Sequence, residues 1–316
     1  MRNKNRTEEV GGNIMFNSHK VFESGEGNVW KYVFESKEAV AEAVLYKYDD
    51  FYKRTVICCS TMSGCPVGCT FCGTGKKFIK NLTCEEIIQQ IKTILVDKDI
   101  QDIDQKGRRF QIMFMSMGEP MLNWTEVEKA IIELHEMYPN AELLISTVGI
   151  ADIKVFNNII ALSQSIPKIG LQFSIHQAQD ALRNNLIPYK NKFTLRELRD
   201  MGTLWAKNTG RKVFLNYCID GENITPLDIC RLQDLFSPMF FNFTFSVVCS
   251  ADESMKEAGF KKLNVINDVS NNFLENGYNV RVFNPDGQDD IGGGCGQLWY
   301  VQQWMKEHQR AGLITR

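Results

Sequence analysis

Three cysteines that lie close together are the residues of this sequence best suited to chemistry. Cys65, Cys69 and Cys72 lie in the segment STMSGCPVGCTFCGTG at 60–75, spaced by three residues and then by two. Thiolates at this spacing can bind one metal centre, and the glycines around them let the backbone wrap closely around it. A structural zinc site usually takes four ligands, whereas this segment has a single C-x-x-C pair and no histidine nearby.

A [4Fe–4S] cluster would account for a set of three thiolates. The cluster has four irons, so three protein ligands leave one iron open to a cofactor. The spacing therefore favours an iron–sulfur cluster. Zinc binding and simple packing of the three side chains stay open as alternatives.

Cys295 is the second candidate for chemistry. It lies in the segment GGGCGQL, where the flanking glycines offer a cysteine side chain little packing but let it approach a ligand. Four other cysteines lie in apolar or helical contexts and are predicted to pack as small hydrophobic residues. These four are Cys84, Cys218, Cys230 and Cys249.

The composition is that of a soluble globular protein. The chain has 316 residues, of which 44% are hydrophobic and 23% charged. It contains no run of about 18 apolar residues that would predict a membrane span, and its polar start lacks the apolar segment of a secretory signal. We therefore expect a cytoplasmic protein without membrane contact, whose ten cysteines form no disulfide framework.

The charge neither favours nor excludes a nucleic-acid partner. The net charge is −2 and the pI about 6.2, whereas proteins that grip long stretches of nucleic acid are usually basic. Local basic patches, KGRR at 106–109 and KNKF at 190–193, still allow contacts with phosphate groups.

Strands and helices alternate from residue 54 to residue 283. Short apolar runs predict the strands, and apolar residues at helical spacing predict the helices between them. Three helices begin with the spacing of a capping box, at 83–86, 125–128 and 194–197. The predicted strands lie at 54–59, 110–117, 141–148, 169–175, 212–219, 242–248 and 278–283, and the helices at 82–97, 124–138, 151–163, 194–208, 226–236 and 263–276.

This alternation requires parallel strands joined by crossover helices. A complete eightfold barrel usually takes about 250 residues, so we predict an α/β fold with a partial (βα)6 TIM-like barrel at 54–285. The segment 1–53, which breaks at Gly27 and again at Asp49–Asp50, would form a small N-terminal β appendage of antiparallel hairpins. Residues 286–316 would form a C-terminal extension that carries the Cys295 loop.

Polar residues stand at the carboxyl ends of the predicted strands, where such barrels place their chemistry. The cysteine loop follows the first strand, Gly118 and Glu119 end the second, Ser146 ends the third, and Ser174–His176 end the fourth. The carboxylate of Glu119 could accept a hydrogen bond from an ammonium group there. Plainer explanations are a polar turn for the Gly-Glu-Pro segment and a structural role for the histidine.

The cysteine segment, with Phe71 before its last cysteine, resembles the signature of the radical SAM superfamily. Five further segments resemble, in the same order, those of the RlmN/Cfr family of RNA adenine methyltransferases, and the likeness covers about residues 28–300. These segments are NLTCEEIIQQI at 81–91, MSMGEPMLN at 115–123, STVGI at 146–150, SIHQAQDALRNNLIP at 174–188 and DIGGGCGQL at 290–298.

The resemblance implies a fold, a reaction and two cofactors. The fold would be the partial barrel of radical SAM enzymes, in which Cys65, Cys69 and Cys72 hold a [4Fe–4S] cluster whose open iron binds S-adenosylmethionine (SAM). Two SAM molecules would be used per turnover. One would methylate Cys295, and the other would give a 5′-deoxyadenosyl radical for methylation of an adenine carbon in RNA.

The resemblance also implies roles for other residues. Cys58 would resolve the covalent enzyme–RNA adduct by forming a disulfide with Cys295, and Glu42 in EAVLY would lie near the substrate adenine. Adjacent Cys59 has no such role and is predicted to pack. The expected SAM contacts are Gly118, Glu119, Ser146, Ser174, Ile175, His176 and Ser250.

The expected partners are RNA (rRNA or tRNA) and an electron donor such as flavodoxin or ferredoxin, and the protein is expected to be a monomer. The sequence departs from the family where a longer helical accessory domain normally precedes the core. It also has the acidic segment NPDGQDD where the family is rich in arginine. These departures keep alternatives open: the same cysteine chemistry on a protein or small-molecule substrate, or a non-enzymatic iron–sulfur or zinc-binding regulator.

Overall fold

A computed structural model describes residues 15–247, 255–283, 291–294, 297–298 and 300–310 of the chain. Three residues with predicted importance, Cys249, Ser250 and Cys295, lie outside the described residues. Within the described part, no helix is long and apolar enough to cross a membrane.

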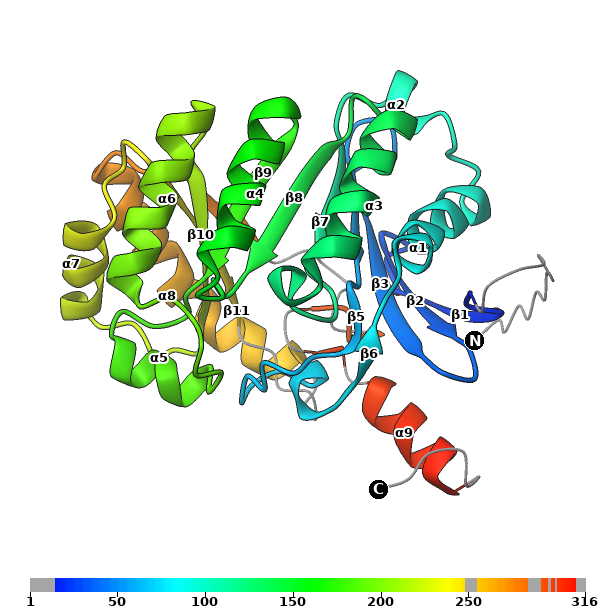
Figure 1. The fold of residues 1–316 in the computed structure, drawn as a ribbon. Helices are drawn as coiled ribbons and strands as arrows, with labels where there is room; N and C mark the ends of the chain where they lie inside the picture. Colours follow the sequence, from blue (N-terminus) through cyan, green and yellow to red (C-terminus); the bar gives the residue numbers. More distant parts are fainter. Residues whose placement is uncertain (1–14, 248–254, 284–290, 295–296, 299, 311–316) are drawn as a thin grey trace.

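The main feature of the fold is a sheet to which the described residues contribute ten strands (Figure 1). Seven of these strands run parallel and follow one another across the sheet in sequence order, as predicted for a partial barrel. They are β4 (Thr55–Cys59), β7 (Phe110–Phe114), β8 (Glu142–Thr147), β9 (Ile169–Ser174), β10 (Val213–Ile219), β11 (Phe241–Val247) and β12 (Val280–Phe283). Each lies within a few residues of its predicted bounds.

Three N-terminal strands extend this sheet. The strands β1 (Ser18–Glu23), β2 (Val29–Glu35) and β3 (Val40–Lys47) pair antiparallel, as predicted for hairpins. However, β3 also pairs antiparallel with β4, so the N-terminal strands belong to the same sheet as the barrel. The predicted boundary at residue 53 falls in the turn that joins β3 to β4.

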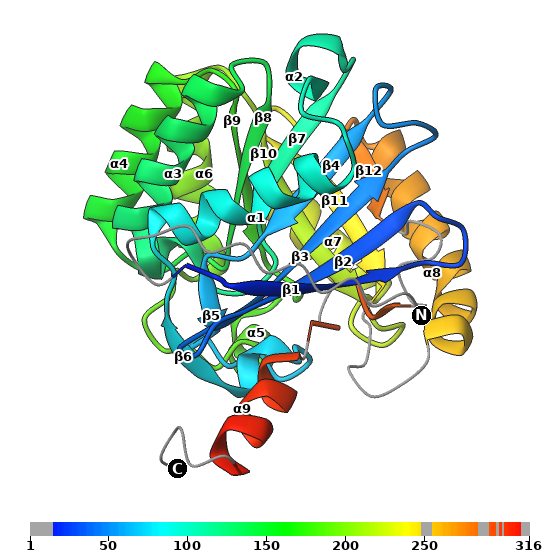
Figure 2. The same cartoon turned by 90° about the vertical axis from the view of Figure 1, so that its right-hand side faces the viewer.

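In the part of the chain that the structure describes, six long helices connect the parallel strands and cover the outer face of the sheet (Figures 1 and 2). Two of the predicted capping boxes are confirmed, Thr83 with Glu86 and Thr194 with Glu197. The box at 125–128 is wrong, because the helix already begins at Trp124 and Thr125 lies inside it. The six helices are α1 (Cys84–Asp97), α3 (Trp124–Met137), α4 (Ile153–Ser165), α6 (Leu195–Thr209), α7 (Pro226–Leu235) and α8 (Met255–Glu275).

Several short elements were not predicted. All but α9, an 11-residue helix within the predicted C-terminal extension, are too short for a hydrophobic period to identify them. They comprise β5 (Met62–Gly64), β6 (Phe78–Asn81), α2 (Ile103–Lys106), α5 (Asp180–Leu186), α9 (Tyr300–Arg310) and the 3₁₀ turns Thr74–Lys76 and Pro120–Asn123.

Alternation along the strands gives the sheet two different apolar faces. Cys59 packs in the large core between the sheet and the helices. Its neighbour Cys58 points the other way, into a second apolar cluster with Met117, Leu298 and Trp304. The inner face of the sheet is therefore covered in part by the C-terminal segment and α9.

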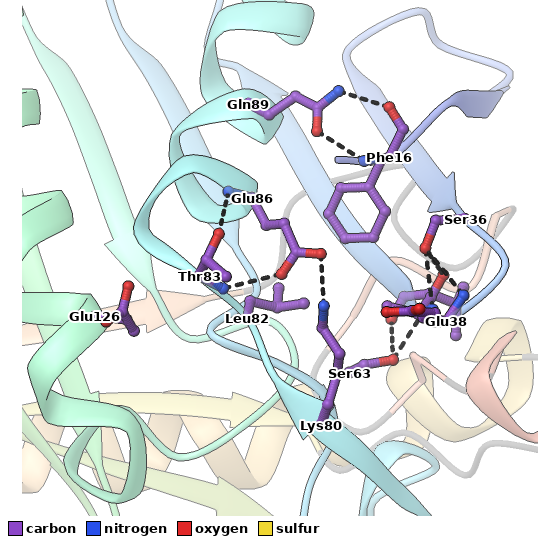
Figure 3. A network of polar contacts seen from close by, with 12 residues as sticks. Phe16, Ser36, Glu38, Ser63, Lys80, Leu82, Thr83, Glu86, Gln89 and Glu126 are labelled. Carbon is purple, nitrogen blue, oxygen red and sulfur yellow. Dashed lines mark hydrogen bonds and ion pairs between the residues drawn. The ribbon is translucent and has the colours of Figure 1, made fainter. Parts of the chain in front are cut away.

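A two-stranded sheet of β5 and β6 carries the cysteine loop between its strands. Lys80 forms an ion pair with Glu86 at 2.8 Å, which fastens β6 to the start of α1 (Figure 3). The Ser63 hydroxyl donates to the Val40 carbonyl at 2.7 Å and fastens β5 to β3. The loop therefore stands on a base anchored on two sides.

Gly64 closes that base. Its φ is +77°, and a Cβ there would lie 2.2 Å from the Lys77 carbonyl oxygen, to which the Cys65 N–H donates at 2.8 Å. Only glycine fits both the backbone angle and the close approach.

We expect Gly64→Ala to lower the free energy of unfolding by about 2 kcal/mol or more, because it combines a left-handed residue with a backbone clash. Gly210→Ala is the matched control. Gly210 has φ +70° but nothing within 4 Å of its Cβ position, so about 1 kcal/mol is expected there. Urea denaturation of both variants measures the difference, and equal losses would contradict the clash.

Candidate active site

The three cysteines lie in the loop between β5 and β6. The Cys72 N–H donates to the Cys69 carbonyl at 3.2 Å, which makes the C-x-x-C segment a tight turn. Burial raises the pKa of Cys65 to about 12. Burial also raises the pKa of Cys69, and the neighbouring Cys72 and Cys65 raise it further. The thiols are therefore within electrostatic reach of one another.

The donor set of this loop fits an iron–sulfur centre. Among the described residues no three Cys, His, Asp or Glu side chains already converge as a metal site, so metal binding would have to draw the three thiols together. Each thiol must also lose its proton to become a ligand, and burial opposes that loss unless a metal supplies positive charge. Three thiols of one anchored loop satisfy the chemistry of such a centre.

The cysteine loop packs over the carboxyl ends of the parallel strands, as predicted. The Thr70 N–H donates to the Leu186 carbonyl of α5 at 2.9 Å. The Phe71 ring meets the His176 ring edge-on, with 5.2 Å between their centroids. These contacts bring the loop to the end of β9.

Glu119 lies beside this loop and joins two strand ends. It is 2% exposed, and its Oε2 accepts from the Val148 N–H at 2.8 Å while its Oε1 accepts from the Met121 N–H at 3.1 Å. Burial raises the pKa of Glu119 to about 7, against the lowering effect of these hydrogen bonds. The Thr147 side chain bonds to this carboxylate as well, so of its roughly four acceptor sites about one stays open for a ligand donor.

Gly118 allows this turn to approach β5 closely. Its φ is +99°, and a Cβ there would lie 2.7 Å from the Thr61 hydroxyl and from the Met62 Cβ. No other residue type fits without moving β5, so the glycine sets the position of Glu119.

A row of polar side chains lies beyond Glu119, on the inner face of the sheet. The Ser146 hydroxyl accepts from Gln172 Nε2 at 3.0 Å. Ser174 stands opposite Asn216 of β10, and the Ile175 N–H donates to the Asn216 carbonyl at 3.0 Å. The sequence analysis identified the two serines and Ile175 but missed the two amide side chains, which look like ordinary strand residues.

His176 adopts a rare backbone angle for its type, with φ +55°. Its Nδ1 accepts from the Cys218 N–H at 3.0 Å, so in the neutral ring Nε2 carries the proton. Burial lowers the pKa of His176 to about 3, and the positive charge of Arg183 lowers it further. The ring is therefore a neutral hydrogen-bond donor at the mouth of the barrel.

Arg183 is a buried residue of the site that sequence reasoning missed. Its side chain is fully buried and donates to the carbonyls of Val148 at 2.6 Å and Phe193 at 2.8 Å. It thereby ties α5 to the loop after β8. The only available signal was its place within the family-like segment 174–188.

Glu42 holds the C-terminal segment. Its Oε2 accepts from the Tyr300 N–H at 2.9 Å, and its Oε1 lies 3.3 Å from Lys31 Nζ. Lys31 in turn donates to the Gly292 carbonyl at 3.4 Å. Burial raises the pKa of Glu42, and Lys31 opposes that shift.

The rest of the described C-terminal segment is fastened in the same way. The Tyr46 hydroxyl donates to the Gly293 carbonyl at 2.8 Å, and the Thr74 hydroxyl to the Leu298 carbonyl at 2.7 Å. The segments on both sides of position 295 are thus tied to β3 and to the cysteine loop.

Cys58 shares the inner face with Leu298 and is 6% exposed. Cys59 is fully buried on the outer face, and burial raises the pKa of its thiol. No disulfide joins two of the described cysteines. The predicted packing of Cys59 is therefore confirmed, and the role expected for Cys58 stays a prediction. Cys295 and Ser250 lie outside the described residues.

The lowered pKa of His176 makes stability depend on pH. Between pH 6.5 and about 3 the unfolded chain binds a proton at this residue that the folded protein does not, so stability falls as the pH falls. We expect the free energy of unfolding to drop by about 2 kcal/mol from pH 7 to pH 5 through this group. His176→Asn should remove this part of the drop, because asparagine tolerates a positive φ and can accept the same N–H.

Urea denaturation of wild type and His176→Asn at pH 8, 7 and 5 measures the effect. From pH 8 to pH 7 the free energy of unfolding should change by the same amount in the two proteins. If the difference in free energy of unfolding between the two proteins is the same at pH 5 as at pH 7, the His176 ring is not buried in its neutral form.

Comparison with known proteins places this chain in a family. No family model matches the chain. A "probable dual-specificity RNA methyltransferase RlmN" of Thermotoga sp. (strain RQ2) is 30% identical over 275 residues, which cover 85% of this chain and 75% of that protein. A protein of the same name from Carboxydothermus hydrogenoformans is 32% identical over 302 residues, covering 92% and 83%.

Solved structures agree with this likeness. A radical SAM methyltransferase from Sphaerobacter thermophilus superposes with a TM-score of 0.73 at 26% identity, covering 88% of this chain and 79% of that one. Streptococcus suis SuiB shares the fold alone, with a TM-score of 0.52 at 14% identity, covering 75% of this chain and 50% of that one. With its cysteine loop at the mouth of a partial parallel barrel, the chain belongs to the RlmN/Cfr-like family of radical SAM methyltransferases.

Proposed function

We propose that this protein methylates an adenine carbon of RNA by radical SAM chemistry that passes through a methylated cysteine. The observation that carries the proposal is the anchored loop of three cysteines beside Glu119 and His176, at the carboxyl ends of the strands. The RlmN names of relatives at 30% identity or above support RNA as the substrate.

The residues that would hold the cofactors come from neighbouring strand ends. Cys65, Cys69 and Cys72 would hold the [4Fe–4S] cluster, and Glu119, at their side, would accept a hydrogen bond from the SAM ammonium group. The other proposed SAM contacts are Gly118, Ser146, Ser174, Ile175, His176 and Ser250. When bound, the reduced cluster and SAM would supply the one-electron chemistry that removes a hydrogen atom from a methyl group.

Two further cysteines would carry the methyl group and release the product. Cys295 accepts the methyl on its sulfur, because a thiolate is the best nucleophile in the chain whereas adenine carbons are poor ones. The carbon would join the adenine as a radical, and the ring carbon would then give up its proton and one electron, which returns to the oxidised cluster. The Cys58 thiolate then attacks the Cys295 sulfur. The sulfur–carbon bond breaks, its electron pair passes to the carbon side, which takes up a proton, and a Cys58–Cys295 disulfide remains.

The contacts of the described residues support this division of roles. Cys58 faces the side of the sheet on which the C-terminal segment lies, together with Leu298. The bonds of Glu42 and Lys31 to Tyr300 and Gly292 support a positioning role for this pair. An external electron donor such as flavodoxin or ferredoxin would reduce the cluster and later the disulfide. Two SAM molecules would be used per turnover. The protein would act as a cytoplasmic monomer.

Single changes of the three loop cysteines should abolish the cluster. We expect Cys65→Ala, Cys69→Ala and Cys72→Ala each to lose iron and acid-labile sulfide after anaerobic reconstitution, since a cluster with two protein ligands is not held. Cys230→Ala is the control and should leave four irons per chain. The prediction that Cys230 is packed was wrong, because its side chain is exposed on α7. Four irons in any of the three loop variants would count against the assignment.

The experiment that tests the proposed function separates Cys58 from its neighbour. Cys58→Ala, purified from cells and digested with ribonuclease, should retain a nucleotide covalently bound to Cys295, because the thiol that releases the adduct is missing. Cys295→Ala should carry neither a methyl group nor a nucleotide. Mass spectrometry of the tryptic peptides measures both.

Cys59→Ala is the matched control, since it removes a thiol that faces the outer core. It should retain no nucleotide. A Cys58→Ala protein with methylated Cys295 but no nucleotide would rule out RNA as the substrate, and an unmethylated Cys295 in the wild type would overturn the mechanism.

A further inference from the structure

A cavity of about 660 Å³ opens at the amino ends of the parallel strands, opposite the cysteine loop. Its wall includes the first or second residue of six strands, from Gln111 of β7 to Arg281 of β12. A volume of this size is typical of sites for small molecules. Nothing in the proposed methyl transfer uses it, because that chemistry lies at the other end of the strands.

The wall of this cavity is strongly basic. Its charged residues are Lys168, Arg211, Lys212 and Arg281 against the single carboxylate of Glu142. A second hollow of about 390 Å³ shares Glu142 with it. That hollow adds Lys53, Arg54, Arg108, Arg109 and Asp49. Two arginines of the KGRR patch are thus placed at this end of the barrel, in a chain whose net charge is −2.

The two carboxylates leave most of this charge unbalanced. Glu142 accepts from Arg109 Nη2 at 2.9 Å and from Gln111 Nε2 at 2.7 Å, and Asp49 is paired with Lys53. Arg211 is committed to backbone carbonyls of the α4–β9 connection. Arg108, Lys168 and Arg281 have no ion pair within the part of the chain that the structure describes.

Arg281 is the most informative of these three residues. Its guanidinium lies over the Phe214 ring, 3.9 Å from the ring centroid, so it presents its donors beside an apolar surface. The side chain lines the cavity and is exposed to solvent. Desolvation by the surrounding wall lowers its pKa, and Arg109 and Arg54 lower it further, while Glu142 opposes the shift. Like charges held this close repel, and a bound anion would relieve the repulsion.

We propose that this basic cavity and the hollow that shares Glu142 with it form a second binding site, one that takes the phosphate groups of a nucleotide or of a nucleic-acid strand. Guanidinium groups match phosphate oxygens in a bidentate geometry, and the Phe214 face gives a neighbouring base or sugar an apolar surface. The site does not depend on the radical chemistry, and its test measures binding alone. The outcome of this test is therefore independent of the outcome of the test of the proposed function.

The test compares two triple variants of the full chain that lose the same charge. The cavity variant is Arg108→Gln, Lys168→Gln and Arg281→Gln, all exposed side chains. The control variant is Lys154→Gln, Arg196→Gln and Arg199→Gln, which lie on α4 and α6 outside the lining of both hollows. Binding of inorganic pyrophosphate and of a labelled 12-nucleotide oligouridine is measured by calorimetry and anisotropy, at several salt concentrations.

For whichever of the two probes the wild type binds, the affinity of the cavity variant should be lower by about tenfold or more. The control variant should bind that probe with the affinity of the wild type. If the three side chains contact three phosphates of the oligouridine, the slope of the logarithm of affinity against the logarithm of salt concentration should be smaller by about two in the cavity variant than in the wild type. An effect on the oligouridine without pyrophosphate binding assigns the site to a nucleic-acid strand, and saturable pyrophosphate binding assigns it to a free phosphorylated ligand. Absence of binding by both probes, or equal losses in the two variants, overturns the proposal.

Discussion

The parallel pairing from β4 through β7 to β12 is the constraint on which the rest of the structure depends. Neighbouring strands run in the same direction, so their carboxyl ends meet at one edge and their amino ends at the other. The cysteine loop, Glu119 and His176 follow three different strands and still share one mouth. The same rule gathers Gln111, Glu142 and Arg281 at the opposite edge. Side chains also alternate in direction along each strand, so the sheet has an outer face covered by helices and an inner face.

Much of this arrangement could be predicted from the sequence, because its signals are local. Apolar runs identified the seven parallel strands, and the cysteine spacing identified the loop. The capping box at 125–128 failed because buried Trp124 already belongs to the helix, so tertiary packing set the helix start. The bond from Tyr300 to Glu42 joins residues 258 positions apart, and a single sequence carries no signal for such a contact. The strands β5 and β6 were too short for any period to appear.

The mouth of the barrel is built from buried polar groups that backbone atoms satisfy. Glu119 accepts two backbone N–H groups, His176 accepts one, and Arg183 donates to two carbonyls. A buried polar group without partners costs free energy, so each of these bonds also fixes the loop that provides the partner. The geometry of the mouth is therefore held by the same side chains that would meet a cofactor, and removing one of them affects position as well as chemistry.

The C-terminal segment depends on a buried ion pair in the same way. Glu42 and Lys31 are both nearly inaccessible to solvent, and each also bonds to the backbone of that segment. Removing one partner would leave the other charge buried alone, which is far more costly than the pair is stabilising. The segment therefore cannot leave the inner face without exposing or neutralising Glu42. A glutamate that the family resemblance places near the substrate thus has a use before any substrate binds, because it holds the residues on both sides of Cys295 against the face that carries Cys58.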